Sequence, residues 1–182
     1  MLRYCVLAIS MVAMSAATAQ SDTSSWLRAK SPDDAFSAET PCSSEELERS
    51  GRSLDRHHLQ EIHVSIQSLV ACQKDGFNLM AGVVQAPVGY ARQASLFDEM
   101  LAHANDDRTA EGTPSLAMID GHRAYLRRQE SNGLIGQTGF VYLSRTKIIF
   151  GVAGGQPAGS SGRKELGETV DRFFGSIRVT AQ

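Results

Sequence analysis

Three of the five histidines lie close together in the sequence, where they could serve as metal ligands or as a general base. His57, His58 and His63 form the segment HHLQEIH, which matches neither the H-E-x-x-H nor the H-x-x-E-H zinc motif. Because a strand is expected from Glu61, the three rings would not converge on one point, and zinc needs three or four converging ligands. We therefore predict no metal site, no cofactor site and no catalytic residue in this segment.

The arrangements that usually activate a nucleophile are missing from the sequence. No G-x-S-x-G segment occurs, so an esterase-type serine has no support. The glycine-rich segment 155–164 invites comparison with a phosphate-binding loop, but Lys164 does not follow a glycine. Glu165 stands where Ser or Thr would hold magnesium. We predict a flexible surface linker here.

The chain has three cysteines, and the first lies within the N-terminal leader described below. The other two, Cys42 and Cys72, do not form a C-x-x-C motif, so thiol–disulfide exchange is not favoured. In an oxidising compartment such a pair predicts a structural disulfide. Closing a loop of about thirty residues should stabilise the fold by about 3–4 kcal/mol.

A group of basic residues surrounds the last pair of expected strands. If those strands are neighbours, the group forms a patch that attracts an acidic partner. An ordinary solvated distribution is the alternative, because the residues divide between both faces of their strands. The residues predicted to bind a partner are Arg123, Arg127, Arg128, Arg145 and Lys147.

The N-terminus has the form of a bacterial secretory signal peptide. A positive start at Arg3 precedes an apolar run over 4–13, and Ala17-Thr18-Ala19 is typical of a cleavage site. We predict a signal peptide over 1–19 and one globular domain over 20–182, located in the periplasm or secreted. No second apolar segment approaches membrane length, so no transmembrane segment is expected. The balance of 18 Lys and Arg against 20 Asp and Glu gives no support for nucleic-acid binding.

Alternating apolar residues dominate the mature chain, and helical periodicity is limited to two segments. Strands are expected over 26–29, 36–40, 61–72, 77–84, 115–119, 122–129, 140–144, 148–152 and 176–179. Helices are expected over 90–104 and 164–174. A turn at Asp75-Gly76 is expected to join 61–72 and 77–84 into a hairpin, and a second turn is expected at Asp120-Gly121. In the strand from residue 61, Ile66 and Val70 are expected on one face.

Three details of these elements are specific enough to test. Residues 43–55 are expected to form a polar surface loop with at most one helical turn, although Ser43 and Glu46 have capping-box spacing. The strand over 122–129 is expected to be exposed. Gly175 fits the left-handed position that closes a helix.

Several short motifs, taken together, resemble the PsbP-like group of proteins. They are Trp26, the segment FSAETP over 36–41, the strand IIFGV over 148–152 and the ending RFFGSIRV over 172–179. The group shares its fold with an extrinsic protein of photosystem II and with a nuclear-import factor that binds the GTPase Ran. The resemblance implies an α+β protein, an α/β/α sandwich. Its mainly antiparallel sheet would have about six to eight strands, with helices on both faces.

The resemblance also implies a function class, because characterised proteins of this fold act mainly as binding or assembly factors. We therefore expect a non-enzymatic binding or accessory protein of the periplasm, with a periplasmic protein or another acidic partner at the basic residues. The alternative is an envelope hydrolase with His122, or the pair His57 and His58, as its base. The sequence leaves the oligomeric state open.

Overall fold

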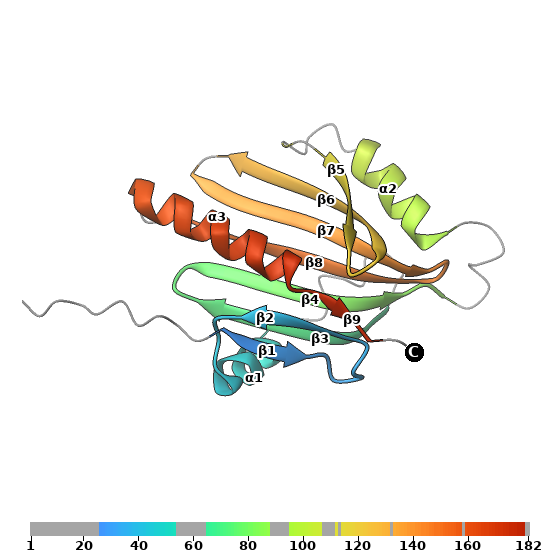
Figure 1. The fold of residues 1–182 in the computed structure, drawn as a ribbon, viewed down its shortest axis with the longest axis horizontal. Coiled ribbons are helices and arrows are strands. Elements are labelled where there is room, and N and C mark those ends of the chain that lie inside the picture. The colour runs from blue at the N-terminus through green and yellow to red at the C-terminus, as the bar shows by residue number, and fades with distance from the viewer. Residues whose placement is uncertain are drawn as a thin grey trace, which may run out of the picture.

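The computed structural model describes residues 26–53, 65–87, 95–106, 112, 114–131, 133–157 and 159–180. Within these residues, nine strands form two antiparallel sheets, and three helices pack around them (Figure 1). The predicted α+β class is confirmed.

The larger sheet has six strands in the order β3-β4-β8-β7-β6-β5, each antiparallel to its neighbours. Two of its hairpins turn through residues with positive φ, Asp75 and Gly76 after β3, and Asp120 and Gly121 after β5. Such turns match the twist of the strands that they join, and they confirm both predicted turns. The strands are β3 (Ser65–Lys74), β4 (Phe77–Gln85), β5 (Pro114–Ile119), β6 (His122–Ser131), β7 (Leu134–Ser144) and β8 (Lys147–Gly155).

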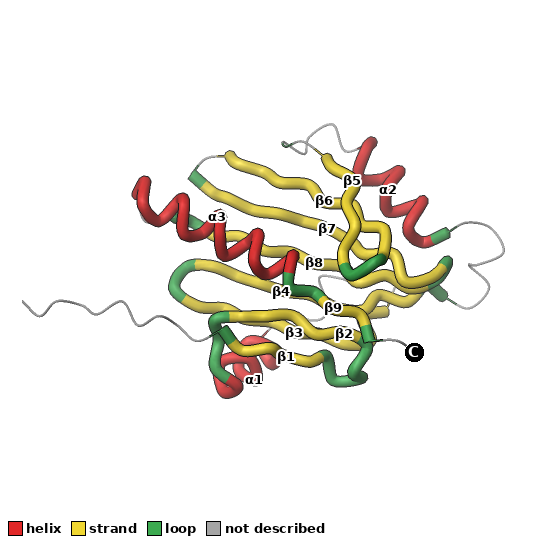
Figure 2. The backbone as a smooth tube through the Cα atoms, in the orientation of Figure 1, coloured by secondary structure: helices red, strands yellow, loops and turns green. Residues whose placement is uncertain are grey.

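One face of the larger sheet is covered by a helix and by the smaller sheet, and we call it the α3 face. The helix is α3 (Gly159–Gly175), and the smaller sheet has the order β1-β2-β9 (Figure 2). Its strands are β1 (Leu27–Lys30), β2 (Phe36–Thr40) and β9 (Arg178–Val179). Buried side chains from all three parts share one core, which includes Phe36, Val70, Leu79, Ile149, Val170 and Phe173.

The opposite face of the larger sheet, the α2 face, carries the helix α2 (Leu96–Asp106). Phe97 of α2 packs edge-on against Phe140 and Tyr142 of β7, with ring centroids 5.5 and 5.3 Å apart. Phe140 in turn stacks on Tyr125 of β6 at 5.0 Å. Helices therefore pack on both faces of the sheet, as predicted.

The third helix, α1 (Ser44–Ser53), lies along the outer edge of β3. Ser43 and Glu46 form the capping box, because the amide of Ser43 donates to Glu46 at 2.7 Å and the amide of Glu46 donates to Ser43 Oγ at 3.3 Å. Ser50 Oγ accepts a hydrogen bond from the edge amide of Gln73 at 3.0 Å. The prediction of a surface loop over 43–55 is therefore wrong. The helix closes an otherwise unpaired strand edge.

Two predictions about helix bounds need correction. In the described residues α2 begins at Leu96, after Ser95 caps it, whereas the start was expected at residue 90; residues 88–94 lie outside the described part. Helix α3 begins at Gly159, so part of the predicted linker is helical. Gly175 belongs to α3 and has no positive φ, so the predicted left-handed cap is wrong.

Two predictions about strands also change. β6 was expected to be exposed, but it lies between β5 and β7, and Ala124, Tyr125 and Arg127 are buried. Ile66 and Val70 were expected on one face of β3. A bulge between Ile66 and Ser68 places Ile66 with the α2-face cluster and Val70 with the α3-face core. The predicted start of this strand lies outside the described residues.

The disulfide between Cys42 and Cys72 is present, and both residues are buried in the core. It joins the end of the smaller sheet to the edge strand of the larger one. Among the described helices, none is both long and apolar enough to cross a membrane.

Candidate ligand cleft

An open cleft of about 710 Å³, which we call the α3 cleft, lies between α3 and the turn that joins β3 to β4. In Figure 1 the start of α3 and this turn lie at the same end of the molecule. This volume is within the range of about 300–1,000 Å³ typical of ligand sites. The lining residues are Trp26, Pro41, Lys74, Asp75, Gly76, Phe77, Gln156, Pro157, Gly162, Glu165, Leu166, Glu168, Thr169 and Arg172.

The floor of the cleft is built where the end of β8 meets the β3–β4 turn. The amide of Gln156 donates to the carbonyl oxygen of Gly76 at 3.4 Å. A Cβ atom on Gly155 would collide with that same oxygen, so the close approach requires glycine there. The chain then leads directly into α3, which places the helix beside the turn.

The α3 side of the cleft comes from one helical face. Gly162, Glu165, Thr169 and Arg172 are spaced three or four residues apart, so they follow one line along the helix. The neighbouring line holds Val170 and other core residues. One helix therefore supplies both a buried anchor and a wall of the cleft.

Arg172 stands at one end of the cleft and is held in place by two contacts. Its guanidinium lies 4.2 Å from the centroid of the Trp26 ring. It also donates to Glu39 Oε2 from Nε at 3.1 Å and from Nη2 at 3.0 Å. The hydrogen bond from Arg172 is the main reason that the pKa of Glu39 lies below its ordinary value. The positive charge of Arg172 is thus balanced by a residue outside the lining.

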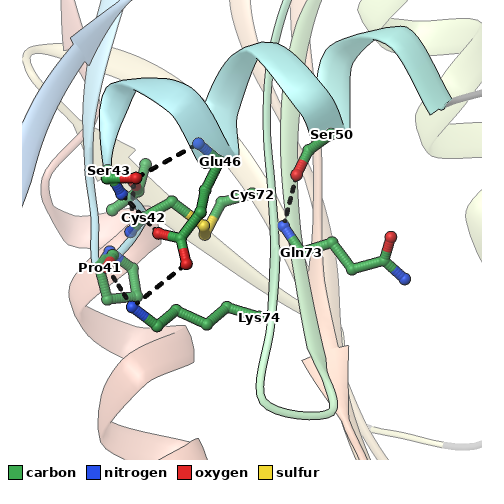
Figure 3. Close-up of a disulfide and its surroundings, with 9 residues drawn as sticks. Pro41, Cys42, Ser43, Glu46, Ser50, Cys72, Gln73 and Lys74 are labelled. Carbon is green, nitrogen blue, oxygen red and sulfur yellow. Dashed lines mark hydrogen bonds and ion pairs between the residues drawn. A yellow bond between two sulfur atoms is a disulfide. The ribbon is translucent and has the colours of Figure 1, made fainter.

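Lys74 is held in the same way at the opposite wall (Figure 3). Its Nζ atom donates to the carbonyl oxygen of Pro41 at 3.4 Å and lies 3.5 Å from Glu46 Oε1. The disulfide between Cys42 and Cys72 fixes the two segments that carry Pro41 and Lys74. This wall of the cleft is therefore stabilised by the disulfide as well as by the ion pair of Lys74 with Glu46.

The remaining charges that line the cleft are carboxylates. Glu168 has Lys164 at 3.7 Å, but Asp75 and Glu165 form no ion pair with any described residue. The apolar side chains of Trp26 and Phe77 line the same cleft, as does the buried Leu166. This combination suits a ligand that has an apolar body and a positive charge.

None of the five basic residues predicted to bind a partner lines this cleft, and they do not share one face. Arg123 lies over the rings of Phe97 and Tyr142, at 4.9 and 5.0 Å from their centroids. Arg127 follows on the same face of β6, about 13 Å further along the strand, and only 7% of it is exposed.

Arg128 points to the opposite face, where Nη1 lies 2.8 Å from Asp171 Oδ1 of α3. Arg145 is exposed in the β7–β8 turn, and Lys147 begins β8. The register of β4 with β8 puts this turn at the end of the sheet far from the β3–β4 turn. Partner binding by the five residues stays a prediction, but the fold does not gather them into one patch.

Neither of the two described histidines, His103 and His122, lines the cleft. His122 Nδ1 lies 3.2 Å from the carbonyl oxygen of Tyr142, which can only accept, so Nδ1 donates and Nε2 is the basic nitrogen. His103 lies on the exposed surface of α2, 3.8 Å from Glu99. His57, His58 and His63 lie outside the described part of the chain. In that part, no three His, Cys, Asp or Glu side chains are placed to hold a metal ion.

The cleft could not be predicted from the sequence, because its lining comes from four separate segments. The glycine-rich segment after β8, which contributes to the lining, was predicted to be a surface linker. No protein-family model matches the chain, and no curated protein matches it in sequence.

Proposed function

We propose that this chain is a secreted, PsbP-like binding module of the bacterial envelope that receives a positively charged peptide segment in the α3 cleft. The observation that carries the proposal is the charge arrangement of the cleft. Lys74 and Arg172 are each paired with a glutamate outside the lining, whereas Asp75 and Glu165 line the cleft, are exposed and form no ion pair among the described residues.

A peptide segment fits the shape and chemistry of this cleft. The cleft is open and bounded by a helix on one side and a turn on the other, so an extended chain can lie along it. Trp26, Phe77, Pro41 and Pro157 offer flat apolar surfaces for proline or aromatic side chains. A lysine or arginine of the peptide would then reach Glu165 or Asp75.

Binding is favoured over hydrolysis by the residues that line the cleft. The described lining includes no histidine and no cysteine, and Thr169 is its one side-chain hydroxyl. A nucleophilic mechanism would need a base beside that hydroxyl. The predicted leader over 1–19 and the disulfide support an oxidising location outside the cytoplasm.

Trp26 provides a direct test, because it is the single tryptophan of the chain and lines the cleft. The mature protein would be titrated with lysine- and arginine-containing peptides that also hold proline or aromatic residues. Peptides in which glutamate replaces each basic residue serve as ligand controls. We expect a saturable change in tryptophan fluorescence with the basic peptides only.

Charge reversal on the protein supplies the matched comparison. Glu165→Lys should weaken binding at least tenfold, because it places a like charge beside the peptide cation. Glu99→Lys makes the same charge change on α2, across the sheet, and should leave binding intact. The proposal fails if no basic peptide gives a saturable signal, or if Glu165→Lys binds as tightly as Glu99→Lys.

A further inference from the structure

The two outer strands of the larger sheet, β3 and β5, differ in how their outer edges are covered. The edge of β3 is covered by α1, and Ser50 accepts the hydrogen bond of an edge amide. β5 pairs with β6 on one side, and on its other side no described strand pairs with it. Folded proteins usually protect such an edge with charged side chains or a covering element. The six residues of β5, Pro114–Ile119, include no ionisable side chain.

β5 also carries the two most exposed large apolar side chains of the described residues. Leu116 is 73% exposed and Met118 is 65% exposed. Their partners in β6 are Tyr125 and Arg123, so both side chains stand on the α2 face. An uncharged edge strand with two exposed apolar residues on one face has the pattern of a strand that pairs with another.

We propose that β5 pairs with β5 of a second copy of this chain, antiparallel and about a twofold axis at Ala117. In that register Leu116 lies opposite Met118 of the second copy, and Met118 lies opposite its Leu116. Both apolar pairs then stand on the same face of a continuous twelve-stranded sheet. The twofold arrangement satisfies both edges at once, because each copy offers the same surface.

The charges around β5 are compatible with self-pairing. The strand itself is neutral, so like charges do not meet across the axis. Among the described residues of β5 and β6, Arg123 is the cation nearest the axis on this face, and three strand spacings separate β6 from its copy. The two Arg123 residues are therefore about 14 Å apart or more, which exceeds the screening length of about 8 Å at physiological ionic strength.

The interface between two β5 strands is small, so the dimer should be weak. A pair of six-residue strands buries less than the roughly 1,600 Å² of a standard interface. We therefore expect a dissociation constant in the micromolar range and a dimer that separates on dilution.

Light scattering coupled to size-exclusion chromatography tests the proposal on the purified mature protein. At high concentration we expect a molar mass twice that of one chain, falling towards one chain as the protein is diluted. Met118→Lys and, separately, Leu116→Lys should each give the mass of one chain at every concentration. The matched control is Leu134→Lys, which changes another apolar residue, 53% exposed but on β7, and should remain dimeric.

Each outcome decides the question. A wild-type mass of one chain at all concentrations overturns the proposal, and this is also the result if β5 pairs with a strand of a different protein. A dimer that persists in both β5 variants overturns it too, because association would then use another surface. Circular dichroism of each variant checks that the fold is intact. None of these results depends on the α3 cleft.

Discussion

Glu39 joins three parts of the molecule through one carboxylate. Arg28 of β1 donates to its Oε1 atom at 2.8 Å, and Arg172 of α3 donates to its Oε2 atom. These contacts hold the pKa of Glu39 below its ordinary value, with the hydrogen bond from Arg172 as the main cause. The ionised carboxylate therefore stabilises the folded state above the ordinary pKa of a glutamate, about 4.3. The contribution is lost as the pH falls through the lower, folded-state pKa.

Glu39→Gln should lower the free energy of unfolding by about 1 kcal/mol at neutral pH, since surface ion pairs contribute about that much at most. The difference from wild type should shrink as the pH falls below about 4. Urea unfolding at several pH values measures it. Glu45→Gln is the control, because that carboxylate is 82% exposed and Arg49 is its one ion-pair partner among the described residues. An equal loss at pH 7 and at low pH would contradict this account.

Substitution of two glycines by alanine should change the stability of the fold in opposite directions. A Cβ on Gly139 would lie 2.6 Å from Leu126 Cδ2 and 2.9 Å from the backbone oxygen of Tyr125, so it has no room. Gly139→Ala should cost about 1–3 kcal/mol of stability through overpacking. Gly51 lies in α1 with nothing within 4 Å of a Cβ, so Gly51→Ala should stabilise by about 0.5–1 kcal/mol. Thermal unfolding of the two variants should shift in opposite directions, and a shift of the same sign would contradict the packing described.

At the scale of single residues, the sequence predicted what depends on residue type and compartment. Cys42 and Cys72 could be paired because they are the two cysteines outside the predicted leader. The closeness of Gly139 to Leu126 could not be predicted, because it depends on which strands become neighbours. The same limit applies to Asp75 and Glu165, whose position beside one cleft arises from the docking of α3.

At the scale of elements, hairpins were predicted better than helices. The turn at Asp75 and Gly76 sets its own geometry locally, so β3 and β4 could be paired from sequence. Helix α1 was missed because Leu47 is its single apolar contact in the sequence pattern. Its place on the edge of β3 comes instead from a capping box and from Ser50, which tertiary structure alone brings to Gln73.

The capping box gives a prediction at this scale. Ser43→Ala removes the oxygen that accepts from the amide of Glu46, and should cost about 1 kcal/mol. Because α1 covers the edge of β3, the amide of Gln73 should also exchange its hydrogen faster. Hydrogen exchange followed by mass spectrometry measures both effects. Ser44→Ala, in the next residue, is the matched control. Unchanged protection of Gln73 would show that α1 does not depend on its cap.

At the scale of the whole molecule, the disulfide links the smaller sheet, α1 and the edge of the larger sheet. Cys42 follows β2 and directly precedes the capping residue of α1, while Cys72 lies in β3 (Figure 3). The same covalent link fixes Pro41 and Lys74, which line the cleft. The sequence could predict the bond but not that it joins two segments of the cleft lining, because the lining is assembled from distant segments.

Removal of the disulfide should therefore lower both the free energy of unfolding and the affinity of the cleft for peptides. The double variant Cys42→Ser with Cys72→Ser should lose about 3–4 kcal/mol of unfolding free energy in urea, as expected for a loop of about thirty residues. Reductant should lower the stability of the wild type by a similar amount and leave the variant unchanged, which controls for other effects of the reductant. Below its unfolding transition, the variant should bind basic peptides more weakly, because Pro41 and Lys74 are no longer held together.

Equal stability of wild type and variant would contradict the structural role of the bond. Loss of stability without loss of peptide affinity would show that charge contacts alone hold the wall.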